Sequence, residues 1–476
     1  MSGISLGRVT ILLLMSRAAG FILALGNSVI LARVLGAERL GEYAYAMGLA
    51  ALFGLLPNMG ISTIVTRAIA QDPVAGHGVF RAALRAQALL AVGIMIFIPV
   101  FAGLLPEQPV SLLYIGLAAA QLAIGTLSWP YLAVLGGRAR YDRLAQAELA
   151  TGFFGTVSLL VAAAIHGGVM AFLAAQVLAA GVAVLVARQR AVPFLLAGGS
   201  QTMALSTLFR QGAPFGAGAA VQSLYTRVDI LLLGQLASTV ALGLYSAAYK
   251  PITMVVYFGG TVAGVLFPLM AQAPKGCAPE AFRRVLHGLG AGAPALALIL
   301  SGLAGPLLIG LYGSEYAAAA PILIILAWSA AANWLYAPLG VALQARGRER
   351  WWLAVLGCGL SINLLGNLWG IPRWGAVGAA AATLASELAV FAVAAVLIRR
   401  ELPVVFSFKP VLLGMTAAAA GGAVLWALKG SGPVLTTIGA LIVYGGLLVL
   451  FRLVTVQDIA LVRGWVREAA WGGTRG

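Results

Sequence analysis

The sequence predicts an all-α, polytopic membrane protein with fourteen transmembrane helices. Of its 476 residues, 61% are hydrophobic and only 9% are charged, and the mean hydropathy is +0.99. Soluble domains carry far more polar surface. The apolar residues also form fourteen segments, each long enough for a helix to cross a hydrocarbon core of ~30 Å. Helices are predicted because these segments are too long and too uniformly apolar for barrel strands.

Charged residues, prolines and glycines mark the ends of the segments. The expected spans are Val9–Leu35, Tyr43–Ala70, Ala82–Leu105, Pro109–Leu135, Leu144–Ile165, Val169–Ala187, Gly212–Leu236, Ala241–Met270, Val285–Leu311, Ala317–Leu343, Trp351–Trp369, Gly375–Ile398, Pro410–Leu428 and Val434–Leu450. The N-terminus lacks the cleavage-site pattern of a signal peptide, so the first span is expected to be retained as a helix.

The loops between the spans alternate in charge. The cationic segments are 138–143, 188–210, 275–284, 346–350, 399–409 and 452–467, and the intervening loops hold few cations. The positive-inside rule therefore predicts that both termini are cytoplasmic, in the inner (cytoplasmic) membrane of the cell. The net charge of +16 is spread over these loops, which argues for topology and against a nucleic-acid partner.

An internal repeat is visible when the chain is shifted by 202 residues. Gly41-Glu-Tyr43 then falls on Gly243-Leu-Tyr245, and a shift of 208 residues lays Pro130 on Pro338. A chance match in a chain rich in alanine, glycine and leucine is the alternative. Since each repeat holds six spans, duplication predicts two lobes related by a pseudo-two-fold axis along the membrane normal.

The repeat gives the expected domain boundaries. We expect an N-terminal lobe at 1–187 (helices 1–6), a cytoplasmic linker at 188–210, a C-terminal lobe at 211–400 (helices 7–12), appended helices 13–14 at 401–454 and a cytoplasmic amphipathic tail at 455–476.

Five charged residues inside the predicted spans cannot be assigned to a loop, and a charge within the membrane is costly and usually faces a protein interior or water. They are Arg17, Arg227, Asp229, Lys250 and Glu387. The first four are candidates for substrate binding, although Arg17 could instead extend to the interface and the others could form a local ion pair between helices. Glu387 is a candidate coupling-ion residue, with a structurally satisfied acid as the alternative.

Equal sequence distance from the turn at Ser238–Val240 places Asp229 and Lys250 at one membrane depth, which predicts an ion pair between them. Asn27 aligns with Asp229 under the 202-residue shift, and Asn363 and Asn367 lie one turn apart. These three asparagines are candidates for a polar cavity. For Asn363 and Asn367 the alternative is a hydrogen bond between helices, which is the more common role of such a pair. No metal-ligand spacing involves the two cysteines or three histidines, so neither a metal nor a cofactor nor a catalytic group is expected.

Several short segments resemble a known family. They are Ile30-Leu-Ala-Arg33-Val-Leu-Gly36, Gly41-Glu-Tyr43, Tyr245-Ser-Ala-Ala-Tyr-Lys250, Leu266-Phe-Pro-Leu-Met270, Asn363-Leu-Leu-Gly-Asn367, Ile371-Pro372 and Gly375-Ala-Val-Gly378-Ala-Ala. In this order, from the first to the twelfth span, they resemble the polysaccharide exporters of the multidrug/oligosaccharidyl-lipid/polysaccharide exporter superfamily.

The resemblance implies a flippase, not an enzyme, that carries polyprenyl-pyrophosphate-linked sugar units outward by alternating access. A cavity with Arg17, Arg227 and Lys250 suits an anionic sugar pyrophosphate. The implied partners are the lipid-linked oligosaccharide, membrane lipids, a coupling cation (H⁺ or Na⁺) and polysaccharide-assembly proteins. A cation-coupled multidrug antiporter is the alternative, disfavoured by the lack of an acid in the first span. A membrane glycosyltransferase or polymerase is disfavoured by short outer loops.

Overall fold

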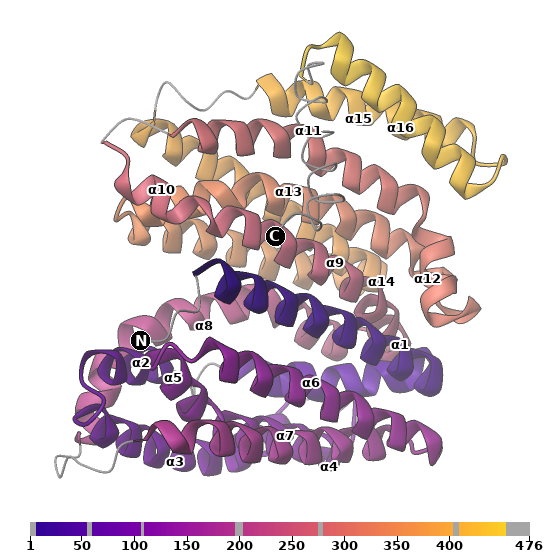
Figure 1. Ribbon diagram of the computed structural model, residues 1–476. Helices are drawn as coiled ribbons and strands as arrows, with labels where there is room; N and C mark the ends of the chain where they lie inside the picture. The colour runs from indigo at the N-terminus through magenta and orange to yellow at the C-terminus, as the bar shows by residue number, and fades with distance from the viewer. Residues whose placement is uncertain are drawn as a thin grey trace, which may run out of the picture. The chain divides into compact units, whose positions relative to one another are not determined.

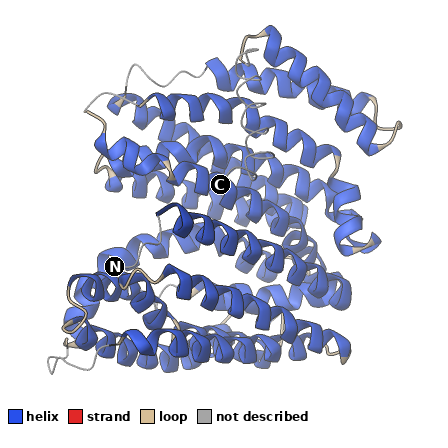
Figure 2. Ribbon diagram, in the orientation of Figure 1, coloured by secondary structure: helices blue, strands red, loops and turns tan. Residues whose placement is uncertain are grey.

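The computed structural model describes residues 6–54, 60–105, 109–195, 203–274, 279–402 and 409–453, and the side chains of 6–18 and 213–220 lie outside this description. Over the described ranges the regular secondary structure is entirely helical (Figure 2). The expected amphipathic tail at 455–476 lies outside the described residues. The chain is therefore an all-α protein over the part that can be compared with the sequence prediction.

The helices follow one another with short connections (Figure 1). They are α1 (Leu6–Leu52), α2 (Ile61–Gln71), α3 (Gly76–Gly103), α4 (Leu112–Thr126), α5 (Trp129–Gly137), α6 (Tyr141–Ala164), α7 (Val169–Ala191), η1 (Val192–Phe194), α8 (Leu205–Leu236), α9 (Thr239–Gly264), α10 (Leu266–Gln272), α11 (Glu280–Gly302), α12 (Ala304–Tyr312), η2 (Ser314–Ala319), α13 (Ala320–Ala345), α14 (Glu349–Glu401), α15 (Lys409–Ala427) and α16 (Pro433–Leu450).

Eleven helices among the described residues are long and apolar enough to cross a membrane. Two of them continue from one predicted span into the next: α14 runs through two spans, and α1 runs through the first span and into the second as far as Leu52. The expected loops are replaced there by one non-helical residue, Gly36 (φ 72°) in α1 and Gly375 (φ 54°) in α14. Glycine reaches positive φ without a steric penalty, so the chain bends at one residue instead of a loop.

Four predicted spans are interrupted, and the simplest case is Val285–Leu311, where α11 and α12 are separated at residue 303. In Tyr43–Ala70, α1 ends at Leu52 and α2 begins at Ile61; in Pro109–Leu135, α4 and α5 are separated at residues 127–128; and in Ala241–Met270, α9 and α10 are separated at residue 265. Pro130, in the first turn of α5, cannot donate a helical hydrogen bond, which explains the break between α4 and α5. Hydropathy alone does not reveal such interruptions, because the residues on both sides are apolar.

The chain divides into two compact units, one of residues 1–251, 311–318 and 360–382 and another of the remaining residues. Within the first unit α6 packs against α1 and α7, α4 packs against α3 and α7, and α2 packs against α5 (Figure 1). Within the second unit α11 packs against α13, α15 and α16.

The outer face of α3 is apolar and exposed. Leu89, Val92, Ile96 and Val100, spaced by three or four residues, have 58–63% of their surface exposed, whereas Ile98 on the opposite face is fully buried. Soluble proteins rarely leave a continuous apolar stripe in water. Contact with lipid explains the exposed face, and the chain is a multi-pass membrane protein.

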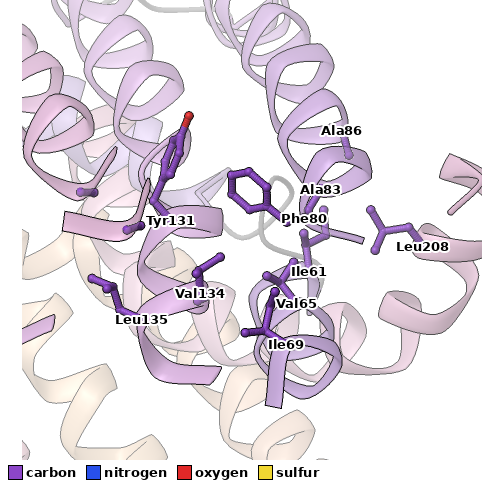
Figure 3. Packing of buried hydrophobic residues seen from close by; sticks show 13 residues of the cluster. Ile61, Val65, Ile69, Phe80, Ala83, Ala86, Tyr131, Val134, Leu135 and Leu208 are labelled. Atoms are coloured by element: carbon purple, nitrogen blue, oxygen red, sulfur yellow. The ribbon is translucent and has the colours of Figure 1, made fainter. Parts of the chain in front are cut away.

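A buried cluster fixes the orientation of the short helix α2. Ile61, Val65 and Ile69 follow one another at intervals of four residues, so they share one face of the helix. They pack against Phe80 of α3 and Val134 of α5 (Figure 3). Because this face is fully buried, the residues on the opposite face of α2 are held outward from the cluster.

A close helix crossing joins the residues that the repeat aligns. A Cβ atom added to Gly41 would overlap the carbonyl oxygen of Thr239, and one added to Gly243 would overlap that of Ala37. Each added Cβ would also lie 3.1 Å from the backbone nitrogen of the other glycine. Ala37 and Thr239, like Gly41 and Gly243, are 202 residues apart, so the contact is reciprocal.

Candidate functional site

The exposed face of α2 carries polar residues at helical spacing. Thr63, Arg67 and Gln71 lie four residues apart, and Arg67 lies about 200° around the helix from the buried Val65. The Thr66 hydroxyl donates to the carbonyl oxygen of Ala133 at 3.2 Å, which ties α2 to α5. The helix is thus held in a fixed rotation with its polar face away from the core.

This polar face lines a pocket of about 500 Å³. The remaining lining comes from Ile64 and Ala68 of α2, from Met203 and from Gln211 near the start of α8. Arg67 is exposed, and its side chain forms neither a hydrogen bond nor an ion pair with any other described residue. Its guanidinium group therefore has all its N–H donors available for an anionic oxygen ligand, for which arginine is well suited. We refer to this site as the Arg67 pocket.

Arg67 was not among the residues predicted for the site. It lies three residues before the end of the predicted span Tyr43–Ala70, where a cation is ordinarily an interface residue. The available signal was the spacing of Thr63, Arg67 and Gln71, which puts all three on one helical face.

Asp229 forms hydrogen bonds that differ from the predicted ion pair. Only 4% of its surface is exposed, its carboxylate accepts a hydrogen bond from the hydroxyl of the fully buried Tyr245, and its Oδ1 accepts one from the Ile230 N–H at 2.8 Å. Neither Asp229 nor Lys250 takes part in the ion pairs formed between described residues. The predicted Asp229–Lys250 pair is therefore wrong, because equal depth left the rotation of the two helices undetermined.

Arg227 and Lys250 remain cations near Asp229. Arg227 is exposed on α8, and it lies close enough to both Asp229 and Lys250 for an electrostatic interaction with each. Lys250 is half-buried on α9, directly before Pro251. The structure thus brings three of the predicted site residues, Arg227, Asp229 and Lys250, close together. The Asp229 carboxylate is hydrogen-bonded to Tyr245, and neither cation forms an ion pair with it.

The three predicted asparagines have different surroundings. Asn27 lines a cavity of about 340 Å³ formed by α1, α4, α5, α6 and α7, which we call the Asn27 cavity. Asn363 and Asn367 are buried in α14, where the Asn367 amide donates to the Asn363 carbonyl oxygen at 2.8 Å and to its Oδ1 at 2.9 Å. The Asn363–Asn367 pair is therefore bonded within its own helix.

Two further predicted residues complete the comparison. The side chain of Arg17, in α1, lies outside the described residues. Glu387 is half-buried in α14, within the second compact unit. No cluster of three or more potential metal ligands occurs among the residues that the structure describes.

A comparison with protein-family profiles assigns the chain to a family. Residues 30–321, more than half of the chain, match the profile of a family described as polysaccharide biosynthesis protein. A search of curated protein sequences found no significant match.

Solved structures provide the fold comparison. A structure described as lipid II flippase MurJ in an inward closed conformation has a TM-score of 0.73 and 11% identity, covering 93% of this chain and 99% of that chain. A multidrug resistance MATE family transporter of the MOP superfamily, in an inward-facing conformation, has a TM-score of 0.57 and 14% identity, covering 80% and 93%. An outward-facing structure described in the same terms has a TM-score of 0.55 and 15% identity, covering 83% and 94%. At these identities the similarity shows a shared fold.

Proposed function

Because the chain belongs to the polysaccharide biosynthesis protein family and has a MOP-superfamily transporter fold, we propose that it is a flippase for polyprenyl-pyrophosphate-linked oligosaccharides. It moves these units across the cytoplasmic membrane by alternating access, for the synthesis of cell-surface polysaccharide. The lipid tail remains in the bilayer while the sugar pyrophosphate crosses through the protein.

The observation that carries this proposal is the Arg67 pocket. A pyrophosphate needs cationic hydrogen-bond donors in a partly dry site, since its charge is costly to remove from water. Arg67 offers an unengaged guanidinium group, and the amides of Gln71 and Gln211 add neutral donors. Arg17, Arg227 and Lys250 are the further cations that we assign to the pyrophosphate along its path. Asp229 is assigned a positioning role, since Tyr245 occupies its carboxylate.

We further propose fourteen spans with both termini in the cytoplasm. Counting α1 and α14 as two spans each raises the eleven candidate helices to thirteen. Helix α8, part of whose side chains are outside the described residues, supplies the fourteenth. The reciprocal Gly41–Gly243 crossing supports two lobes, at 1–187 and 211–400, related by a pseudo-two-fold axis.

The same division into two lobes places the proposed linker and the appended helices. The linker at 188–210 contains the end of α7, η1 and the start of α8, and residues 401–454 hold the appended helices α15 and α16. Glu387 is the proposed site of a coupling H⁺ or Na⁺, because it is an acid in the middle of a predicted span. Polysaccharide-assembly proteins are the proposed partners.

A cation-coupled multidrug antiporter is the second candidate, favoured by the fold similarity to MATE family transporters. The first predicted span contains Asn27 rather than an acid at the position equivalent to Asp229. The acid in the second half is closed off by Tyr245. These features disfavour cation exchange through this pair of positions.

Transport can be tested in liposomes that contain the purified protein and a polyprenyl-pyrophosphate-linked oligosaccharide with a fluorescent sugar. Dithionite outside the vesicles quenches only the outer leaflet, so a flippase makes nearly all of the probe quenchable. Arg67→Gln should slow this at least about tenfold, since hydrogen bonds to charged groups contribute ~1.5–3 kcal/mol. The matched control is Arg373→Gln, which removes an exposed arginine stacked on Trp369. Equal rates in all three proteins contradict the assignment of Arg67, and export of a cationic dye without movement of the lipid probe supports the antiporter.

A further inference from the structure

The Asn27 cavity is a second, half-open pocket in the first compact unit, lined by both polar and apolar residues. It measures about 340 Å³ and shares no lining residue with the Arg67 pocket. This volume is far larger than the ~30 Å³ share of one water molecule and lies in the range of small-molecule sites. The space is therefore large enough for an organic ligand.

Small residues keep this space open. Gly125, Gly152 and Gly155 line it together with alanines of α7. Gly155 is buried, yet a Cβ atom added there would meet no atom within 4 Å. In close-packed protein interiors a buried glycine normally has neighbours in contact, so the empty volume beside Gly155 belongs to the cavity.

The polar lining of the cavity is neutral and rich in hydrogen-bond acceptors. Thr126, Ser128 and Thr151 donate their hydroxyl protons to carbonyl oxygens of their own helical turns, at 2.7–2.8 Å, so the hydroxyl oxygens remain as acceptors. Asn27 Oδ1 is buried without a hydrogen-bond partner among the described residues. A buried acceptor without a donor is unfavourable, so a ligand that brings hydroxyl donors would satisfy it.

Three further groups line the cavity and complete its chemistry. Gln176 hydrogen-bonds the Tyr43 hydroxyl, Gln121 adds a second amide, and the half-buried Trp129 offers an aromatic ring. No arginine, lysine, aspartate or glutamate occurs in the described lining. An anion would find no cationic partner and a metal cation no carboxylate. A molecule with several hydroxyl groups and an apolar ring face fits both the polar groups and the aromatic ring.

We propose that the Asn27 cavity binds one uncharged sugar residue of the transported glycan, while the pyrophosphate binds in the Arg67 pocket. The assignment rests on the proposed flippase function for its physiological ligand. It adds a neutral-sugar subsite formed by α1, α4, α5, α6 and α7, in which Asn27, Thr126, Ser128 and Thr151 accept hydrogen bonds from sugar hydroxyls.

The test uses free neutral disaccharides and the full chain in lipid nanodiscs, which avoids sugar-based detergents. Saturation-transfer NMR measures the binding of maltose, cellobiose, lactose and N,N′-diacetylchitobiose. At least one probe should bind the wild type. Gly155→Val, whose added methyl groups enter the cavity, should abolish the signal, and Asn27→Leu should weaken binding at least about tenfold. The control Gly93→Val places the same group on the exposed face of α3, where an added Cβ also meets nothing within 4 Å, and should bind normally.

The outcomes separate this inference from the proposed function. If no probe binds the wild type, or if Gly155→Val binds as well as the wild type, the sugar subsite is refuted even when lipid-linked oligosaccharide is transported. If disaccharides bind as expected but the lipid probe never crosses, the flippase function fails and the subsite stands. Arg67→Gln should slow transport and leave disaccharide binding intact. If Gly155→Val does not elute from size-exclusion chromatography as a single species, Gly125→Ala is a milder cavity-filling variant. It is expected to weaken disaccharide binding.

Discussion

The hydrogen bond between Tyr245 and Asp229 predicts a specific loss of stability in Tyr245→Phe. This substitution removes only a hydroxyl, since the ring is fully buried and stacked on Tyr249 at a centroid distance of 5.7 Å. The Asp229 carboxylate then keeps one of its two described hydrogen bonds, the one from Ile230. A hydrogen bond to a charged group contributes ~1.5–3 kcal/mol, so the free energy of unfolding should fall by this amount.

The measurement is a double-mutant cycle that combines Tyr245→Phe with Asp229→Asn. Unfolding is followed by circular dichroism as the mole fraction of a denaturing detergent in mixed micelles rises. The two changes should be non-additive, because each removes the same charged hydrogen bond. The control Tyr114→Phe removes a tyrosine hydroxyl that forms no hydrogen bond with any described residue, and it should change stability little.

A second cycle separates this arrangement from the predicted ion pair. Asp229→Asn combined with Lys250→Met should give a coupling energy within ~0.5 kcal/mol of zero, as for residues that are not partners. The reasoning is refuted if the Lys250 cycle shows the larger coupling, or if the Tyr245 cycle is additive. Either result would mean that the lysine, and not the tyrosine hydroxyl, stabilises the carboxylate.

Further predictions concern the crossing, the cations, the coupling site and the topology. Gly41→Ala should destabilise the protein by ~1–3 kcal/mol through overpacking, whereas Gly93→Ala, on an open helix face, should stabilise it by ~0.5–1 kcal/mol. If both substitutions change the free energy of unfolding in the same direction in the detergent titration, the close crossing is contradicted. Lys250→Ala should slow movement of the lipid probe at least about tenfold with normal membrane insertion, and an unchanged rate would exclude pyrophosphate binding there. Glu387→Gln should remove the dependence of transport on a pH or sodium gradient, and a retained dependence would place coupling elsewhere. A cysteine introduced at 346–350 should react with an impermeant maleimide only from the cytoplasmic side, and labelling from outside would reverse the proposed orientation.

The sequence was sufficient for the fold class because lipid imposes a simple requirement. Every spanning segment must be long, apolar and internally hydrogen-bonded, and hydropathy reports that directly. The single-residue bends at Gly36 and Gly375 escaped the prediction because a loop and a glycine bend look alike in a hydropathy profile. The break before α5 could be read only from Pro130.

The site was harder to predict because it depends on rotation and packing. Asp229 and Lys250 share a depth, yet the direction of each side chain is set by neighbours such as Tyr245 that the sequence spacing does not reveal. Arg67 resembled an ordinary interface cation until the buried face of α2 showed that its opposite face lines a pocket. The Asn27 cavity depends on glycines whose importance is visible only when the surrounding space is known.

The Gly41–Gly243 crossing constrains how this chain could have evolved. If the proposed duplication began with a six-helix ancestor that paired with itself, one ancestral glycine met its own copy across the symmetry axis. A side chain gained at that position would have appeared twice in the ancestral dimer and blocked the contact from both sides. After fusion the two glycines became separate positions, but each still faces the backbone of the other half, so a change in one has no compensating change available in the other. Under the proposed duplication, the two halves can diverge widely in sequence, as at Asn27 and Asp229, while this pair of glycines stays fixed.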